Sequence, residues 1–232
     1  MTDPRNRPIR DLFEGIHDVY DRFNHLLSLR VDAWWRYRML QGLTGVGLDV
    51  AAGTGESTER LYVRPGIPQV VGLDIARHPL RIARSRRPGP VYLQGDGTRL
   101  PFPDDRFDFI TVAFGIRNIP DRLAAFREFH RVLRPGGVLR MVEFTLPTLP
   151  LWGALYRLYL LHGIPRLAAW LAGPRVRDAY TYLGRSIHAF PSPSGLAEEL
   201  QRAGFDHITA RPMILETAVL YEAHRVDASP SD

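Results

Sequence analysis

Residues 45–56 read GVGLDVAAGTGE, and this stretch decides the fold. Its first half, residues 45–51, is apolar and typical of a buried strand, and the turn Gly53-Thr54-Gly55 follows at once. Glycines permit a tight turn and let the backbone come close to a ligand. A buried strand that runs into such a turn favours an open parallel sheet, in which ligands bind outside the carboxyl ends of the strands.

Strand and helix patterns alternate from this stretch onward. The further strands that we expect are 69–74, 91–94, 107–114, 138–144, 207–211 and 218–223. The helices that we expect between them are 79–87, 122–133 and 194–203. The alternation predicts an α/β fold with a mostly parallel, seven-stranded sheet covered by helices on both faces.

Two segments lie outside this alternation. Apolar residues at helical spacing between positions 9 and 30 predict an N-terminal helical arm, which we assign to residues 1–40. Residues 147–186 are rich in Leu, Tyr, Trp and Ala, and they predict a helical insert that either acts as a lid or extends the core. We expect one domain over residues 1–226, followed by a disordered tail at 227–232.

The composition excludes several kinds of chemistry. The 232 residues include no cysteine, and all 30 basic residues are arginine because lysine is also absent. Disulfides, cysteine-ligated metals, thiol nucleophiles, Schiff bases and the lysine of a phosphate-binding loop are therefore excluded. None of the eight histidines has a spacing that indicates a metal site, so we expect no metal. Carboxylates, His, Tyr, Ser, backbone amides or a bound cofactor remain.

The formal net charge of +5 raises the question of an anionic partner. The arginines are interleaved with acidic residues rather than clustered beside aromatic residues, which argues against a nucleic-acid-binding module. The sequence has no apolar run of about 18 residues and no apolar signal-peptide core in its first ten residues. We expect a cytoplasmic protein whose positive charge favours contact with the inner face of a membrane.

Four features follow predicted strands and would meet at one edge of the sheet. They are residues 49–56, Asp74, residues 95–97 and residues 114–118. The carboxylate of Asp74 can accept hydrogen bonds from both hydroxyls of a ribose, and an adenine edge can be recognised near Asp96. These features predict a nucleoside-containing ligand.

The glycine turn alone also fits a dinucleotide site. The fingerprint of that site needs a third small residue at position 58, which is Thr58 here. In addition, Glu56 would face the pyrophosphate of NAD, which is an unfavourable contact between like charges. A ligand that carries a sulfonium cation and no phosphate suits an acidic rim better, so the turn favours S-adenosylmethionine over NAD.

Motifs from about residue 20 to residue 205 resemble one family. These motifs are residues 20–24 with Ser28 and Trp35, residues 100–104 with 107–108, residues 114–118, residues 131–137 with 143–145, and Tyr180, Tyr182-Leu183, Ser186-Ile187 and Phe190-Pro191. They are similar to class I S-adenosylmethionine-dependent methyltransferases, and among these to the C-methyltransferases of menaquinone and ubiquinone biosynthesis. The resemblance implies a Rossmann-like fold and S-adenosyl-L-methionine as the cofactor. The chain departs from the family pattern at Phe23, Asp32, Arg134 and Thr145.

The resemblance also implies which residues hold the cofactor. The residues that would contact it are Thr54, Asp74, Ile75, Asp96, Gly97 and Ala113. Gly53 and Gly55 would shape the turn, and Asp49 would orient the loop or approach the methionine amino group. Two alternatives stay open: Asp49 is a structural carboxylate at a strand end, and Asp96 serves only a turn.

The implied chemistry is methyl transfer to a ring carbon. A hydroquinone that loses a phenolic proton gains charge on its ortho carbon, which attacks the sulfonium methyl, so the protein supplies orientation, water exclusion and phenolate stabilisation. Arg117 stays protonated and would stabilise the phenolate, while a water or Tyr20 and Asp21 would relay the proton and Asn118 would hold the loop or the quinol. The alternatives are a structural ion pair for Arg117 and an anchoring role for Tyr20 and Asp21. Glu143 is a further candidate for the pocket wall.

We expect a prenylated quinol as substrate. Demethylmenaquinol is favoured over a 2-methoxy-6-polyprenyl-1,4-benzoquinol or another small lipid or aromatic compound. Trp152, Tyr156, Tyr159 and Trp170 lie among leucines in the insert and would offer a groove for the prenyl tail and peripheral contact with a membrane. The alternative is that these residues only pack a core. The sequence leaves the oligomeric state open, a homodimer included.

Overall fold

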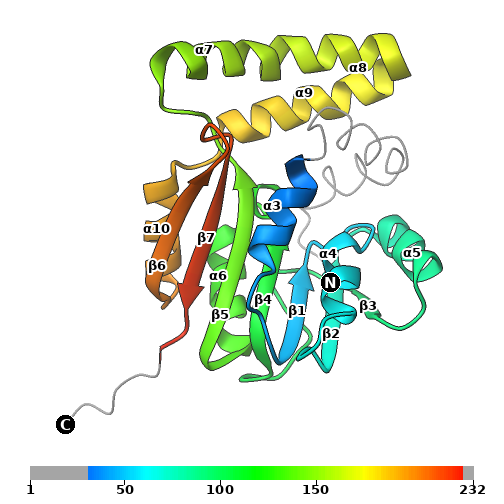
Figure 1. Ribbon diagram of the computed structural model, residues 1–232, viewed down its shortest axis with the longest axis vertical. Coiled ribbons are helices and arrows are strands. Elements are labelled where there is room, and N and C mark those ends of the chain that lie inside the picture. The colour runs from blue at the N-terminus through cyan, green and yellow to red at the C-terminus, as the bar shows by residue number, and fades with distance from the viewer. Residues whose placement is uncertain (1–30, 227–232) are drawn as a thin grey trace.

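The computed structural model describes residues 31–226, which build a seven-stranded sheet (Figure 1). The strands are β1 (Val46–Val50), β2 (Gln69–Asp74), β3 (Val91–Gln94), β4 (Phe107–Ala113), β5 (Leu133–Phe144), β6 (Asp206–Met213) and β7 (Ala218–His224). They lie in the order β3-β2-β1-β4-β5-β7-β6. Strands β1 to β5 pair in parallel, and β7 is antiparallel to both of its neighbours. The predicted mostly parallel sheet is confirmed.

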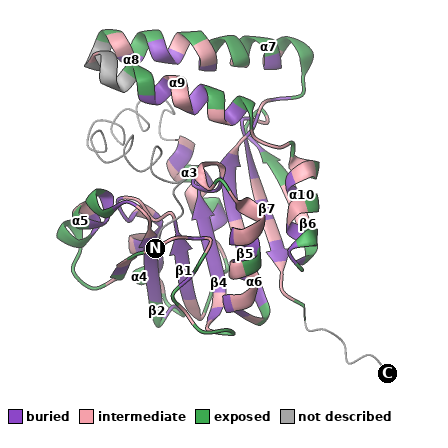
Figure 2. Cartoon of the chain, turned by 180° about the vertical axis from the view of Figure 1, so that it is seen from behind, coloured by how far each residue is buried: buried purple, intermediate pink, exposed green. Residues whose placement is uncertain are grey.

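Helices cover both faces of this sheet, and each face has its own core (Figures 1 and 2). The helices are α3 (Val31–Met39), α4 (Glu56–Tyr62), α5 (Arg77–Arg86), α6 (Arg122–Val132) and α10 (Pro193–Arg202). Trp35 and Leu61 of α3 and α4 share a core with Phe109 of β4. Phe126 and Leu200 of α6 and α10 pack in the other core, against the opposite side of the same strands. Burial of these apolar side chains on both faces stabilises the layered fold.

The strand order places a switch point beside β1. The chain leaves β1 toward β2, whereas β4 lies on the other side of β1, so the following helices α4 and α6 cover opposite faces. Val50 pairs with Leu73 on one side and with Val112 on the other. This register brings the ends of β1, β2 and β4 level at one edge, where open α/β sheets bind their ligands.

Helix α4 was not expected from the sequence. Its residues 56–62 show little apolar periodicity because Leu61 is its one buried apolar side chain, and the buried residues Ser57 and Thr58 are polar. Strand β5 begins at Leu133, five positions before the predicted start, since Leu133 already pairs with Phe107. The register then shifts between Phe107 and Phe109, so the glycines of residues 136–137 make an irregularity within the strand rather than a break before it.

A helical segment lies across the carboxyl ends of the strands (Figure 1, top). It consists of α7 (Pro150–Leu158), the π-helical turn η3 (Tyr159–Gly163), α8 (Ile164–Ala172) and α9 (Pro174–His188). Pro165 follows the π-helical turn, where the wider backbone accommodates a residue that has no N–H and would crowd the preceding turn. Leu160 and Ile164 pack with Tyr180 in a core of their own. The segment expected as a helical insert, residues 147–186, is therefore helical from Pro150 onward, apart from Gly173 between α8 and α9.

Two expectations lie at or beyond the limits of the described residues. Of the expected N-terminal arm, α3 is described, whereas residues 1–30 and the tail at 227–232 lie outside the described range. Within residues 31–226, no helix has both the length and the apolar composition required to cross a membrane.

Candidate active site

The turn after β1 is tied to the end of β2 by one carboxylate. Gly53 and Gly55 have φ values of 56° and 88°, a left-handed conformation that favours glycine. Asp74 Oδ2 accepts a hydrogen bond of 2.8 Å from Gly53 N, and Oδ1 accepts one of 2.8 Å from Ala76 N. Burial raises the pKa of Asp74, and these backbone hydrogen bonds oppose the rise. The contacts orient Asp74 at the edge where the ligand is expected.

Asp49, unlike most of the other predicted cofactor residues, is buried beneath the site. Its carboxylate is buried, and it accepts hydrogen bonds from Thr58 Oγ1 at 2.6 Å and from Thr111 Oγ1 at 2.8 Å. Burial raises its pKa, and both hydroxyl contacts oppose the rise. Asp49 is not among the residues that line the two cavities described below, and neither is Gly55. These contacts join β1 to α4 and β4, which favours an orienting role for Asp49.

A cavity of about 150 Å³ lies at the ends of β1, β2 and β3. Its lining residues are Val50, Ala51, Leu73, Asp74, Ile75, Ala76, Gly95, Asp96, Gly97, Phe114, Gly115, Asn118 and Ile119. Asp96 Oδ1 accepts hydrogen bonds from Thr98 N at 2.9 Å and from Thr98 Oγ1 at 2.8 Å. Two carboxylates among apolar walls suit a ligand with hydroxyl and amino groups on a flat, apolar body, such as a nucleoside.

A second cavity of about 370 Å³ lies between the sheet edge and the helical segment. Its lining is dominated by aromatic and aliphatic residues, among them Trp35, Phe114, Phe144, Trp152, Tyr156, Tyr159, Leu160, Ile164, Tyr180, Leu183, Ile187, Ile214 and Leu215. Gly53, Thr54, Ala113, Arg117 and Asn118, all predicted site residues, also line it. This composition suits a large, mainly apolar molecule that reacts close to the turn after β1.

The two cavities adjoin. Ala51, Phe114 and Asn118 line both of them. A ligand that begins in the first cavity beside Asp74 and passes over Thr54 would therefore present its far end to the second cavity. The structure thus brings together predicted residues from the ends of β1, β2 and β4 and from the segment after β3.

An aromatic cluster forms one side of the second cavity. The rings of Phe114 and Phe144 stack with centroids 4.5 Å apart, and Trp35 lies 5.9 Å from each of them. The guanidinium carbon of Arg117 lies 5.4 Å from the Phe144 ring centroid, and that of Arg36 lies 5.2 Å from the Phe114 centroid. The rigid rings and two cations make a surface that suits a flat, electron-rich ring.

Arg117 is held in place on several sides. Its Nη1 atom lies 2.6 Å from Glu143 Oε1 and 2.5 Å from the carbonyl oxygen of Phe114, and its backbone N–H donates to Glu143 Oε2 at 3.3 Å. Arg117 lies in the 3-10 turn Ile116–Asn118 after β4, and Glu143 comes from β5. The structural ion pair that the sequence left as an alternative is thus present, and Arg117 also lines the second cavity.

Asn118 connects the two parts of the site. Its Oδ1 atom accepts a hydrogen bond of 3.1 Å from Tyr182 Oη of α9, so the helical segment is fastened to the turn after β4. Tyr20 and Asp21, the other two residues predicted for catalysis, lie outside the described residues. In the described part of the chain, no group of three or more His, Cys, Asp or Glu side chains could hold a metal ion.

Several lining residues were missed by sequence reasoning. Ile214 and Leu215 lie in the turn between β6 and β7, and Trp152 Nε1 donates a hydrogen bond of 3.0 Å to the carbonyl oxygen of Leu215. Asp32 and Arg36 of α3 line the same cavity. No local pattern marks the β6–β7 turn as a binding segment, because only the tertiary fold brings it over the strand ends.

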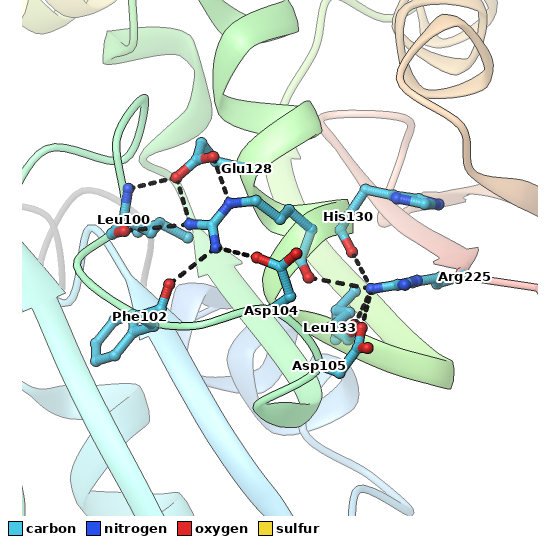
Figure 3. Close-up of polar contacts among 9 residues, drawn as sticks. Leu100, Phe102, Asp104, Asp105, Glu128, His130, Leu133 and Arg225 are labelled. Atoms are coloured by element: carbon cyan, nitrogen blue, oxygen red, sulfur yellow. Dashed lines mark hydrogen bonds and ion pairs between the residues drawn. The ribbon is translucent and has the colours of Figure 1, made fainter.

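The motif residues around Arg131 have a structural role (Figure 3). Arg131 pairs with both carboxylate oxygens of Glu128 at 2.7 and 2.8 Å and with Asp104 at 2.7 Å, and it donates to the carbonyl oxygens of Leu100 and Phe102. This network lies at the amino ends of β4 and β5, the edge opposite the cavities. The motifs at 100–104 and 131–137 therefore fix the fold rather than the site.

Comparison with known proteins gives a consistent family. The model of the ubiE/COQ5 methyltransferase family matches residues 1–219. The chain is 38% identical to the demethylmenaquinone methyltransferase of Mycolicibacterium paratuberculosis, with 96% of each chain covered. It is also 38% identical to the demethylmenaquinone methyltransferase of Deinococcus radiodurans, covering 87% of this chain and 86% of the relative.

Solved structures share the fold at low sequence identity. An S-adenosylmethionine-dependent methyltransferase of Thermotoga maritima, described as a possible histamine N-methyltransferase, superposes with a TM-score of 0.68 at 19% identity, covering 93% of this chain and 98% of that one. Phosphoethanolamine N-methyltransferase 2 of Haemonchus contortus, in complex with phosphomonomethylethanolamine and S-adenosylhomocysteine, superposes with a TM-score of 0.61 at 16% identity. That match covers 84% of this chain and 52% of the other.

Proposed function

The chain belongs to the ubiE/COQ5 methyltransferase family, and we propose that it transfers a methyl group from S-adenosylmethionine to a ring carbon of demethylmenaquinol. By family and by fold it is a class I S-adenosylmethionine-dependent methyltransferase. The names of the relatives favour a demethylmenaquinol over a benzoquinol or another lipid.

The residues of the first cavity fit the cofactor. Asp74 still has acceptor capacity for a ribose hydroxyl, since a carboxylate has about four acceptor sites and three backbone N–H groups, those of Gly53, Ile75 and Ala76, donate to it. Asp96 would recognise the adenine edge, while Ile75 and Gly97 would contact its faces. Thr54 and Ala113 would hold the methionine part at the second cavity. The bound cofactor supplies an electrophilic methyl group there.

The second cavity supports a quinol ring as acceptor. Its aromatic cluster of Trp35, Phe114 and Phe144 would stack on the ring and exclude water. Arg117 would stabilise the negative charge that develops on the quinol oxygen when its proton leaves. Its ion pair with Glu143 would hold the guanidinium ready beforehand, so little reorganisation would be needed during the reaction.

One observation carries this proposal: a nucleoside-type cavity and a larger aromatic cavity share Ala51, Phe114 and Asn118 beside the glycine turn. The test is incubation with S-adenosylmethionine and either reduced demethylmenaquinone or the corresponding benzoquinol, with mass detection of the methylated product. We expect methylation of the naphthoquinol at the higher kcat/KM. A preference for the benzoquinol, or no product from either, would refute the proposed acceptor.

A prenylated acceptor resides in a bilayer, and the proposal therefore includes peripheral contact of a cytoplasmic protein with the inner face of a membrane. The helical segment would then act as a lid over the second cavity. The sequence left a homodimer open, and the proposal makes no use of one.

A further inference from the structure

We propose that the outer side of α7 and α8 is the surface that docks on an anionic lipid bilayer, and that the prenyl tail of the acceptor reaches the second cavity directly from that bilayer. This proposal rests on the proposed function and identifies the surface that would mediate membrane contact. We define the apolar ridge as Leu151, Leu155, Leu158 and Trp170.

The apolar ridge is unusually exposed for residues of its type. Its side chains are 76%, 53%, 59% and 80% exposed, in sequence order. The three leucines are spaced four and three positions apart, which places them on one side of α7. Figure 2 shows exposed stretches along the same two helices. An exposed leucine stripe with a tryptophan is the composition of helices that lie in a membrane interface.

A second side of the same helices, about a third of a turn from the apolar ridge, is apolar as well. Trp152, Tyr156, Leu160 and Ile164 face the second cavity and line it. The helical run is therefore apolar on two sides, one toward the cavity and one toward the surroundings. A helix that is apolar around much of its circumference is buried when it functions, and a bilayer can supply that burial on the outer side.

The charge around the apolar ridge complements an anionic surface. Between Glu143 and Asp178 the sequence contains four arginines and no acidic residue. Arg157 and Arg166, which come from α7 and α8, are exposed. Arginines beside an amphipathic helix favour anionic headgroups, whereas a second copy of the same basic segment would repel it. The charge therefore favours a lipid surface over self-association as the occupant.

The second cavity opens beside the apolar ridge. Ile214, Leu215 and Tyr159 all line this cavity and are also 44%, 61% and 41% exposed. Trp152 holds the turn at Leu215 through its indole N–H, and Glu216 of the same turn accepts hydrogen bonds from Thr148 N and Oγ1 just before α7. An apolar opening at this place lets the tail leave the cavity into hydrocarbon without crossing water.

The test compares the full-length protein with a ridge variant, L151S/L155S/L158S, and with a matched control, V63S/V91S/V226S. The control residues are exposed apolar residues elsewhere in the described chain, and neither set lines either of the two cavities described above. Each protein is floated with vesicles of phosphatidylcholine and phosphatidylglycerol and with vesicles of phosphatidylcholine alone. Tryptophan fluorescence of the wild type and of W170F reports whether Trp170 enters the interface.

We expect the wild type and the control to float with the anionic vesicles, less so at high salt, and the ridge variant to partition at least about 30-fold more weakly because three leucines are lost. We expect a blue shift on vesicle binding that W170F lacks. Equal flotation of all three proteins would overturn the proposal. Wild-type protein that never floats with anionic vesicles would also overturn it. If, in that case, sedimentation shows that the wild type is a dimer and the ridge variant a monomer, the apolar ridge is a dimer interface instead.

A second readout separates this proposal from the proposed function. Methyl transfer is measured on a short-tailed, water-soluble demethylmenaquinol and on a long-tailed one in anionic vesicles. We expect the ridge variant to keep wild-type turnover on the short-tailed quinol and to lose at least tenfold on the long-tailed one. If the wild type methylates neither quinol, the proposed acceptor fails, while flotation still decides whether the apolar ridge docks. If the ridge variant retains full activity on the long-tailed quinol, the proposed route of the tail is wrong.

Discussion

Arg117 Nη1 and Glu143 Oε1 lie 2.6 Å apart, in an ion pair whose side chains are 4% and 0% exposed. A buried pair of this kind contributes little net stability, but loss of either partner leaves an uncompensated charge in the interior. The pair also reaches the second cavity through Arg117. The ion pair therefore fixes the conformation of the turn after β4 and holds the guanidinium of Arg117 at the cavity where the quinol would bind.

Replacement of Arg117 by alanine tests its electrostatic role. We expect kcat of R117A to fall by about 100-fold, since it removes a fixed cation that would stabilise the developing phenolate. The matched control is R122A, which breaks the half-buried pair of Arg122 with Glu199 away from the cavities. Near-normal turnover of folded R117A, checked by circular dichroism, would show that the ion pair is only structural.

Replacement of Glu143 by glutamine tests whether the pair positions Arg117. E143Q keeps a hydrogen-bond acceptor for Arg117 but leaves its charge uncompensated, so we expect about 3 kcal/mol loss in free energy of unfolding. We also expect kcat to fall while the affinity for S-adenosylhomocysteine, measured by calorimetry, stays unchanged, because Glu143 lines neither cavity. A variant that is less stable but has unchanged kcat would limit Glu143 to a structural role.

Asp74 provides the test of the first cavity. D74N retains one acceptor oxygen. We expect the backbone N–H of Gly53 and the ribose hydroxyls to compete for that oxygen. Loss of a charged acceptor for ribose hydroxyls should weaken binding of S-adenosylhomocysteine by roughly 10- to 100-fold. Calorimetry measures this directly, and D104N, in the Arg131 network at the opposite sheet edge, is the control. Unchanged affinity of D74N would refute the assignment of the ribose to this carboxylate.

The Glu128–Arg131 pair makes a prediction about pH. The hydrogen bonds from Arg131, opposed by burial, lower the pKa of Glu128 from its ordinary value of 4.5. A lowered folded-state pKa contributes stability that is present above the unfolded value and is lost as pH falls through the folded value. We expect E128Q to be less stable than the wild type by about 1–2 kcal/mol at neutral pH. This difference in free energy of unfolding should shrink below pH 4.5, and a difference that is constant with pH would contradict the assignment.

The sequence predicted those elements whose own residues carry the signal. Strands β2 and β3 have the predicted bounds because each is a short run rich in strand-forming residues, with four buried residues in β2 and with Tyr92 buried in β3. Helix α4 was missed because buried hydroxyls rather than apolar residues fix it, through Thr58 and Asp49. A polar contact between this helix and the preceding strand leaves no periodic pattern that could be recognised.

The same limit applies to the site. Arg117 and Asn118 could be singled out from the turn after β4. Glu143 was expected at the pocket wall, but it lines neither cavity and instead pairs with Arg117, a contact that depends on the parallel register of β4 and β5. The contribution of Ile214 and Leu215 depends on the antiparallel β6–β7 connection folding over the strand ends. Local sequence singled out residues at individual strand ends, whereas the shape of the second cavity required the assembled fold.

Methyl transfer to a carbon of a reduced quinol ring can be measured directly. The direct measurement is a reaction with S-adenosylmethionine that carries a deuterated methyl group, followed by mass and NMR analysis of the product from reduced demethylmenaquinone. We expect the label to appear on the ring carbon, and only when the quinone is reduced. Label on a quinol oxygen, or equal transfer to the oxidised quinone, would contradict it.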